Sequence, residues 1–191
     1  MRSLVALSLG AAVVAGGALL APTPLAARAL SFAENLPLIG TGGGHSFTRN
    51  CPAGSVLTGV RWRTGAVVDG IGIQCSTVRS DGTLGPRTDV GSMAGGNGGT
   101  AGRDDCHGGV VAGQNGATAG VSLGSLFFRC FQWSPAARAY TGAVNYTINV
   151  RIGLLISASE SQCHDGDKPA VGLYGRHGSF IDAVGVICGK P

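Results

Sequence analysis

Short apolar runs separated by glycine are the dominant pattern of the chain. In residues 172–188, three glycines interrupt an apolar stretch, which continues through Ile181, Val184 and Val186 and contains a single carboxylate, Asp182. Apolar side chains at every second position mark the core-facing side of a strand, and glycine-rich breaks mark turns. The stretch therefore predicts a β-hairpin with Asp182 close to its turn.

This hairpin pattern occurs three times along the chain, and cysteines mark each occurrence. In each unit, glycine stands ten positions before the second cysteine, and apolar residues stand four and two positions before it. The glycines are Gly65, Gly120 and Gly178, and the apolar pairs are Ile71 and Ile73, Leu126 and Phe128, and Val184 and Val186. Constant spacing of this kind indicates an internal repeat. We place the three units at approximately residues 40–78, 92–133 and 144–190.

The rest of the sequence favours strands over helices. Residues 144–156 are dominated by β-branched side chains and predict further strands of the third unit. Glycine accounts for 34 of the 191 residues, and it costs about 1 kcal/mol per helical position relative to alanine. We therefore predict an all-β protein.

The first 29 residues predict a signal peptide. A long Ala, Val, Leu and Gly run ends at Ala27-Arg28-Ala29, a small-residue step suited to cleavage before Leu30. The alternative is a retained membrane anchor, because the run is about long enough to cross a bilayer; Pro22 and Pro24 favour cleavage. We expect a secreted domain of residues 30–191 with no integral membrane span. Its 12 basic and 10 acidic residues indicate no nucleic-acid partner.

Six cysteines in an exported chain predict three disulfides. The spacing favours a bond inside each unit, while bonds between units are the alternative. The pairs inside units are Cys51 with Cys75, Cys106 with Cys130, and Cys163 with Cys188. A zinc site is disfavoured because the chain has no CxxC motif, and we predict neither a metal nor another cofactor.

The third hairpin resembles the last hairpin of the jacalin-related lectins (β-prism I), whose sugar-binding loop carries the pattern GxxxD before an apolar strand. Gly178, Ser179, Phe180 and Asp182 fit that pattern, and the first unit repeats it with Gly65, Ala66, Val67 and Asp69. The second unit has Gly124 where the others have Asp. The family also carries a Gly-Gly pair on a neighbouring loop. Gly43-Gly44 and Gly98-Gly99 resemble it, whereas the third unit has no such pair.

The resemblance covers roughly residues 40–190. It implies a β-prism of three four-stranded antiparallel sheets with pseudo-threefold symmetry and, here, one disulfide per repeat. In the family's prism, the Gly-Gly loop of one unit faces the GxxxD loop of the preceding unit. The resemblance thus implies two carbohydrate sites: site 1 with Gly43, Gly44, Gly178, Ser179, Phe180 and Asp182, and site 2 with Gly98, Gly99, Gly65, Ala66, Val67 and Asp69. The third combination would join the second unit's turn, which lacks the Asp, to the third unit's loop, which lacks the Gly-Gly pair.

These sites imply a lectin that binds glycans. Each carboxylate would accept hydrogen bonds from sugar hydroxyls, and Phe180 would offer an apolar face to a sugar ring, making site 1 the stronger. Galactose-preferring members cut the chain beside the Gly-Gly loop, which here stays internal, so the resemblance implies mannose- or glucose-type glycans. Monosaccharide affinity is expected near millimolar. Useful binding then needs both sites of one chain or a homodimer.

Two other functions are open. The disulfides are similar to those of the vitelline membrane outer layer protein, a secreted β-prism, and imply a structural or interaction protein of an extracellular surface. An enzyme is disfavoured because no nucleophile context is recognisable. His107 and His164 each follow the first cysteine of a unit and are interpreted as turn residues, although residues 164–167 are a weak cation candidate. His45 and His177 are expected beside site 1.

Overall fold

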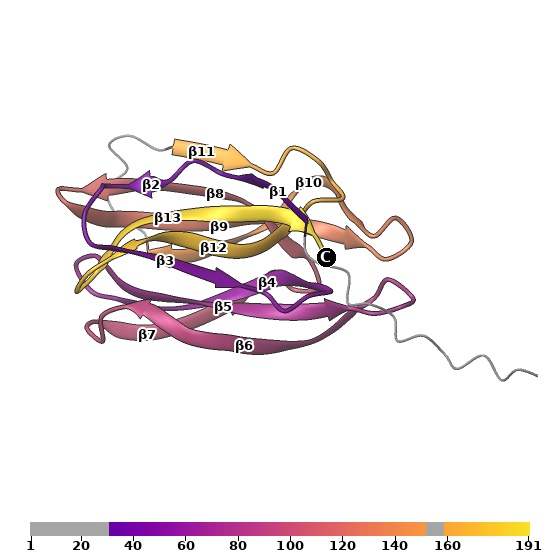
Figure 1. The fold of residues 1–191 in the computed structure, drawn as a ribbon, viewed down its shortest axis with the longest axis horizontal. Helices are drawn as coiled ribbons and strands as arrows, with labels where there is room; N and C mark the ends of the chain where they lie inside the picture. The colour runs from indigo at the N-terminus through magenta and orange to yellow at the C-terminus, as the bar shows by residue number, and fades with distance from the viewer. Residues whose placement is uncertain (1–30, 152–158) are drawn as a thin grey trace, which may run out of the picture.

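The computed structural model describes residues 31–151 and 159–191, so the predicted signal peptide lies outside the described residues. The described chain forms three antiparallel sheets (Figure 1). Sheet A contains β1 (Ser31–Asn35), β2 (Ile39–Gly40), β3 (His45–Asn50), β12 (Ala170–His177) and β13 (Ile181–Lys190). Sheet B contains β4 (Ser55–Thr64), β5 (Val68–Val78), β6 (Leu84–Gly95) and β7 (Thr100–Asp105). Sheet C contains β8 (Val110–Ala119), β9 (Ser122–Ser134), β10 (Ala139–Arg151) and β11 (Ser159–Gln162).

The three sheets share one strand order, which confirms the predicted β-prism with three repeats. The orders are β1-β13-β12-β3, β6-β5-β4-β7 and β10-β9-β8-β11, and the two-residue β2 also pairs with β13. Each sheet therefore has a central hairpin, and one edge strand comes from the segment that then crosses into the next sheet. This exchange places the strand after each predicted Gly-Gly pair, β3 or β7, beside the hairpin of the preceding unit around the prism.

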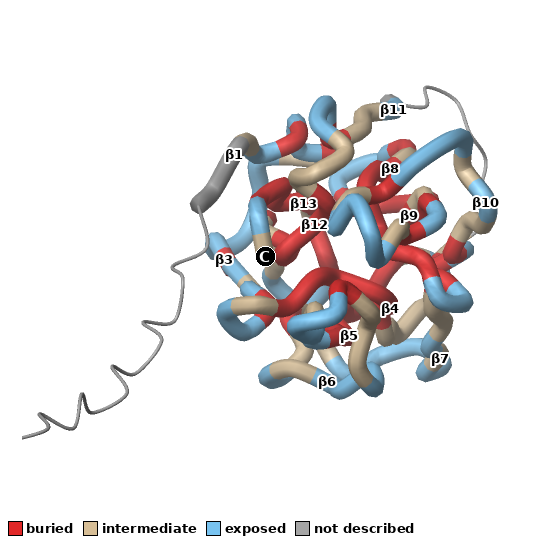
Figure 2. Tube along the Cα trace, turned by 90° about the vertical axis from the view of Figure 1, so that its right-hand side faces the viewer, coloured by how far each residue is buried: buried red, intermediate tan, exposed pale blue. Residues whose placement is uncertain are grey.

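The hydrophobic core lies between the sheets, as the buried residues in the middle of Figure 2 show. The apolar positions four and two before the second cysteine of each unit are all at most 1% exposed, as the period-two pattern predicted: Ile71, Ile73, Leu126, Phe128, Val184 and Val186. Burying a side chain of this size contributes roughly 1.5–3 kcal/mol. The three inner faces together hold the prism closed.

The three disulfides confirm the pairing within units. Cys51 bonds Cys75, Cys106 bonds Cys130, and Cys163 bonds Cys188. In each bond the first cysteine lies where the chain crosses between sheets, and the second lies on the returning strand of the next hairpin. Each disulfide thus ties a crossover segment to the sheet that it enters.

The prediction that the run at residues 144–156 supplies further strands of the third unit is wrong for its described part, residues 144–151. The described part of this run belongs to β10, which pairs with β9 in sheet C and so completes the sheet of the second hairpin. A β-branched run predicts a strand but does not specify its partner, and the short turn after β9 favours pairing with the adjacent strand. In the third hairpin's sheet, the outer neighbours of β13 are instead the N-terminal strands β1 and β2.

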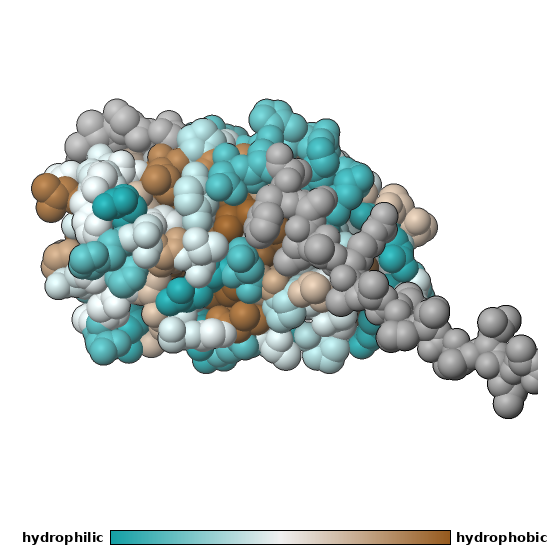
Figure 3. Space-filling view, viewed as in Figure 1, coloured by the Kyte–Doolittle hydropathy of each residue, from teal (hydrophilic) through white to brown (hydrophobic). Residues whose placement is uncertain are grey.

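The central hairpins all turn at the same end of the prism, on the left in Figure 1. We call this the loop end, defined by the turns at residues 65–67, 120–121 and 178–180. On the face drawn in Figure 3, apolar atoms form separate patches between polar ones. The exposed large apolar side chains are Leu38, Val121 and Phe180, and the last two lie in the loop-end turns. No described helix has the length and hydropathy needed to cross a membrane.

Candidate functional site

A β-bulge follows the loop-end turn of every central hairpin. In each case the strand register skips one residue on the returning strand, and the skipped residues are Asp69, Gly124 and Asp182. A bulge re-aims the side chain that it carries and is frequent beside functional sites. The three hairpins therefore present the same backbone position, which carries a carboxylate in two of them.

Site 1 is assembled from sheet A. The Gly43-Gly44 pair immediately precedes β3, and β3 pairs with β12 beside the bulge. A Cβ atom added to Gly43 would lie 3.2 Å from Asp182 Oδ1, and one added to Gly44 would lie 2.3 Å from Asp182 Oδ2. Gly44 also has φ +64°, a conformation that favours glycine. The Asp182 carboxylate thus packs on the glycine pair at a distance that leaves no room for a side chain at Gly44.

Site 2 repeats this geometry in sheet B. Gly98-Gly99 precedes β7, which pairs with β4. A Cβ atom added to Gly98 would lie 2.5 Å from Asp69 Oδ1, and one added to Gly99 would lie 2.6 Å from Asp69 Oδ2; Gly99 has φ +61°. The structure therefore brings together the glycine pairs and carboxylates in the combinations that the resemblance implied. Their role in binding a sugar stays a prediction.

Each carboxylate has one enclosed oxygen without a hydrogen-bond partner, Asp69 Oδ2 and Asp182 Oδ2. Leaving a buried acceptor unpaired costs roughly 1–3 kcal/mol, and more for a charged group. Asp69 is 7% exposed, whereas Asp182 is half-buried. An enclosed, unpaired carboxylate oxygen at matching positions of two hairpins makes Asp69 and Asp182 the candidate functional residues of the loop end.

The remaining predicted site residues lie around these carboxylates. Gly65 and Gly178 open the turns, and Cβ atoms added to them would lie 3.4 Å from Asp69 Oδ2 and 3.9 Å from Asp182 Oδ2. Phe180 is 42% exposed, and Ser179 beside it is also exposed. In site 2, Ala66 is exposed and Val67 is half-buried. An aromatic face is thus open to solvent at site 1, and site 2 offers only small aliphatic groups.

Two arginines at the sites were missed from the sequence. Arg176 of β12 donates to Gly43 O from Nε at 2.7 Å and to Gly44 O from Nη2 at 2.6 Å. Arg63 of β4 repeats both bonds, to Gly98 O at 2.7 Å and to Gly99 O at 2.8 Å. Both arginines stand two residues before the glycine of GxxxD, so the longer pattern RxGxxxD was readable in the sequence.

The second hairpin has the bulge but lacks both the arginine and the carboxylate. Thr118 stands in place of the arginine and Gly124 in place of the carboxylate. Its turn is also tighter, because Ala119 pairs directly with Ser122. Part of the segment that would supply its glycine pair lies outside the described residues.

The two sites are neighbours at the loop end. Gly96 donates its N–H to Asp69 O at 2.7 Å, and a Cβ atom added to Gly96 would lie 2.3 Å from Ser179 O. The segment between β6 and β7 therefore contacts site 1 with its first part and forms site 2 with Gly98 and Gly99. Site 2 is further held by Arg151 of β10, which donates to Gly65 O at 2.7 Å.

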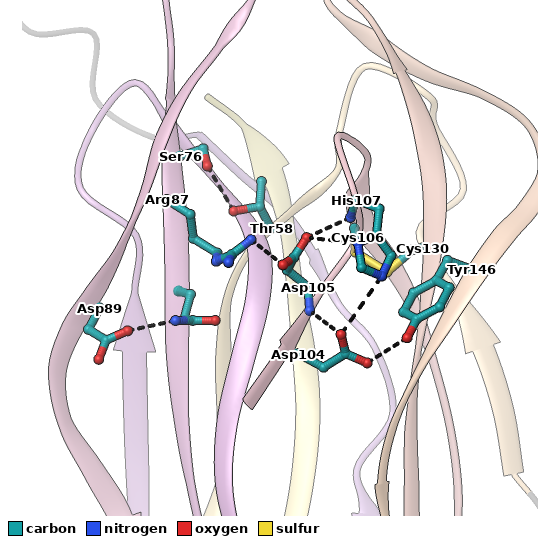
Figure 4. A network of polar contacts seen from close by, with 11 residues as sticks. Thr58, Ser76, Arg87, Asp89, Asp104, Asp105, Cys106, His107, Cys130 and Tyr146 are labelled. Atoms are coloured by element: carbon teal, nitrogen blue, oxygen red, sulfur yellow. Dashed lines mark hydrogen bonds and ion pairs between the residues drawn. A yellow bond between two sulfur atoms is a disulfide. The ribbon is translucent and has the colours of Figure 1, made fainter. Parts of the chain in front are cut away.

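A second polar cluster surrounds the Cys106–Cys130 disulfide (Figure 4). Asp105 accepts the His107 backbone N–H at 2.7 Å and pairs with Arg87. Asp104 accepts from the Tyr146 hydroxyl at 2.7 Å, and this bond raises the pKa of Tyr146. The bond between Asp104 and Tyr146 joins sheet B to β10 of sheet C, whereas Arg87 and Asp105 both belong to sheet B. Since both carboxylates already have protein partners, the cluster is best explained as a structural one.

The histidines and the weak cation candidate also have defined positions. His107 lies in a turn with φ 48°. His164 pairs with Glu34, Asp165 with Lys168, and Asp167 with Lys190. These acidic groups are therefore used by protein partners, and no group of three or more potential metal ligands occurs among residues 31–151 and 159–191. His45 and His177 face each other across β3 and β12, beside site 1 as expected.

Three antiparallel sheets around one core, with loop pairs at one end, define a jacalin-like β-prism, and solved structures confirm this fold. A variant of Malaysian banana lectin matches with a TM-score of 0.58 and 18% identity, over 83% of this chain and 98% of its own. A mannose-binding jacalin-related lectin from Ananas comosus matches at 0.55 and 22%, over 85% and 98%. Artocarpin bound to mannopentose matches at 0.58 and 12%, over 83% and 98%. No family model matches the sequence, and no curated protein matches it.

Proposed function

We propose that the protein is a secreted lectin that binds mannose- or glucose-type glycans through sites 1 and 2. One observation carries the proposal: carboxylate, glycine pair and arginine occur together in two hairpins, while the second hairpin lacks both the carboxylate and the arginine. A purely architectural use of these residues would require them in all three hairpins, because the three sheets share one strand order.

The chemistry of each site suits a polyol. Oδ2 of each Asp is enclosed, so Oδ1 is the oxygen that would accept a sugar hydroxyl, while N–H groups of the glycine loop donate. Charge-assisted bonds of this type contribute roughly 1.5–3 kcal/mol each. Site 1 is the stronger of the two, because Asp182 is less buried than Asp69 and Phe180 is exposed beside it. The similar fold of two mannose-related lectin structures supports the ligand class.

A glycan array on the mature protein tests the proposal, with the double variant Asp69→Asn plus Asp182→Asn beside it. We expect mannose- or glucose-terminated glycans to bind the parent and not the double variant. In calorimetry with methyl α-mannoside, each single variant should retain one sugar per chain, and the altered site should weaken roughly tenfold or more. Equal binding by the parent and the double variant would contradict the proposed sites.

The alternative is a structural or interaction protein of an extracellular surface. The disulfide in each unit favours it, since each bond strengthens a crossover and a closed loop of this length contributes about 3 kcal/mol in the chain-entropy model. A parent protein that binds no glycan on a broad array, yet is correctly folded, would support this alternative.

A further inference from the structure

Each site contains an arginine that donates two hydrogen bonds to backbone carbonyls of the glycine pair. Arg176 and Arg63 each donate from Nε to the first glycine and from Nη2 to the second, at 2.6 to 2.8 Å. A guanidinium is a planar fork whose donors have fixed directions. Two bonds from one fork therefore fix two consecutive peptide planes at once.

We propose that Arg63 and Arg176 are positioning residues that hold the Gly-Gly loops in the sugar-binding conformation; this inference rests on the proposed function. In a trans peptide, the C=O and the following N–H point in opposite directions. An arginine that holds Gly43 O or Gly98 O on one side therefore turns the N–H of Gly44 or Gly99 to the other side. That N–H is the donor that a sugar oxygen would use.

Glycine loops need such a restraint more than other loops do. Residues 42–44 and 98–99 consist only of glycine, the residue that loses most conformational freedom on ordering. Without a tether, each sugar would have to order the loop as it binds, and that ordering would reduce its affinity. With the arginine in place, the loop is already ordered in the folded protein, so sugar binding does not have to supply the entropy of ordering it.

The second hairpin argues against a general role in pairing strands. Its first strand, β8, also has a neighbour, β11, in the position that β7 and β3 occupy beside β4 and β12. Thr118 of β8 stands where Arg63 and Arg176 stand, and the same hairpin lacks the carboxylate. The arginine is thus found only with the other parts of a site.

The test uses Arg176→Lys and Arg63→Lys. Each variant keeps the positive charge but cannot make the paired Nε and Nη2 hydrogen bonds of a guanidinium. Calorimetry with methyl α-mannoside should show roughly tenfold weaker binding at the altered site and unchanged binding at the other. NMR order parameters of the Gly44 or Gly99 amide, measured without sugar, should fall only in the corresponding variant. Arg176→Gln provides a second variant if the Lys variant does not fold.

Arg49→Lys is the matched control. Arg49 lies on β3 and donates to Ser92 O at 2.9 Å and to Thr48 O at 3.0 Å, away from the glycine pair. It should change neither sugar affinity nor the order parameter of the Gly44 amide. The inference alone is overturned if the parent binds the sugar and Arg176→Lys behaves like this control in both measurements. If the folded parent binds neither methyl α-mannoside nor glycans on the array, both the proposed function and this inference are wrong.

Discussion

At the scale of single residues, the sites depend on glycines that cannot be replaced. Three neighbouring glycines before β3 differ sharply in their surroundings. A Cβ atom added to Gly44 would lie 2.3 Å from Asp182 Oδ2 and 2.4 Å from His177 O, whereas one added to Gly42 would meet nothing within 4 Å. Gly44 also has a positive φ, which strains any L side chain.

Gly44→Ala is therefore expected to abolish sugar binding at site 1 and to lower the free energy of unfolding by roughly 1–3 kcal/mol. Gly42→Ala should leave both quantities close to those of the parent. Calorimetry with methyl α-mannoside and chemical denaturation measure the two effects. Similar affinities in the two variants would show that Gly44 is not part of the site.

At the scale of elements, β1 is attached to the prism partly by a titratable contact. Glu34 of β1 lies 2.9 Å from His164 Nδ1, on the segment that crosses from sheet C to sheet A. The hydrogen bond with Glu34, and then the attraction of its charge and that of Asp165, raises the pKa of His164 above its ordinary value. Because the folded pKa is raised, the contribution to stability is complete below about pH 6.5 and is lost as pH rises through the folded pKa.

Glu34→Gln should therefore lower the pKa of His164 toward its ordinary value. The variant should also lose part of the difference in thermal stability that the parent shows between acidic and alkaline buffer. NMR titration of the His164 ring and melting curves at both pH values measure these effects. An unchanged pKa of His164 in the variant would rule out this contact in solution. His164→Gln is the partner control and should abolish the same pH dependence.

At the scale of the whole molecule, the two sites are both in contact with one backbone segment, Gly95-Gly96. The Gly95-Gly96 backbone lies between Asp69 of site 2 and Ser179 of site 1. A methyl group on Gly96 would have to displace the turn at Ser179 or the segment that carries Gly98 and Gly99. The sites are therefore mechanically coupled although they belong to different sheets.

Gly96→Ala is accordingly expected to weaken sugar binding at both sites, whereas Asp69→Asn should affect only site 2. Asn97→Ala, in the same segment with an exposed side chain, is the control and should bind like the parent. Calorimetric stoichiometry and affinity with methyl α-mannoside distinguish the three variants. Two unchanged sites in Gly96→Ala would show that the turn and the segment adjust independently.

Local regularities predicted much of this molecule correctly. Period-two apolar positions such as Ile71 and Ile73 specify which side of a strand is buried, since alternate side chains must point to opposite faces. Nearly equal cysteine spacing favoured the disulfides that are observed, because each bond closes within one repeating unit. The resemblance in GxxxD and Gly-Gly motifs implied the prism and the loops that meet in it. All of these signals lie within short stretches of chain.

Tertiary structure decided which strands became neighbours. Residues 144–151 were correctly predicted to form a strand, yet their partner is β9, and β13 is covered by the N-terminal β1 and β2. The bonds from Arg63 and Arg176 join each arginine to loop glycines that are 35 to 133 residues away in sequence. Propensity and periodicity describe one segment at a time, whereas pairing depends on how all three sheets close over a common core. The sequence by itself determined most strands and their buried faces and favoured the disulfides that form. Only the closed prism determined which strands are neighbours and brought each arginine to its glycine pair.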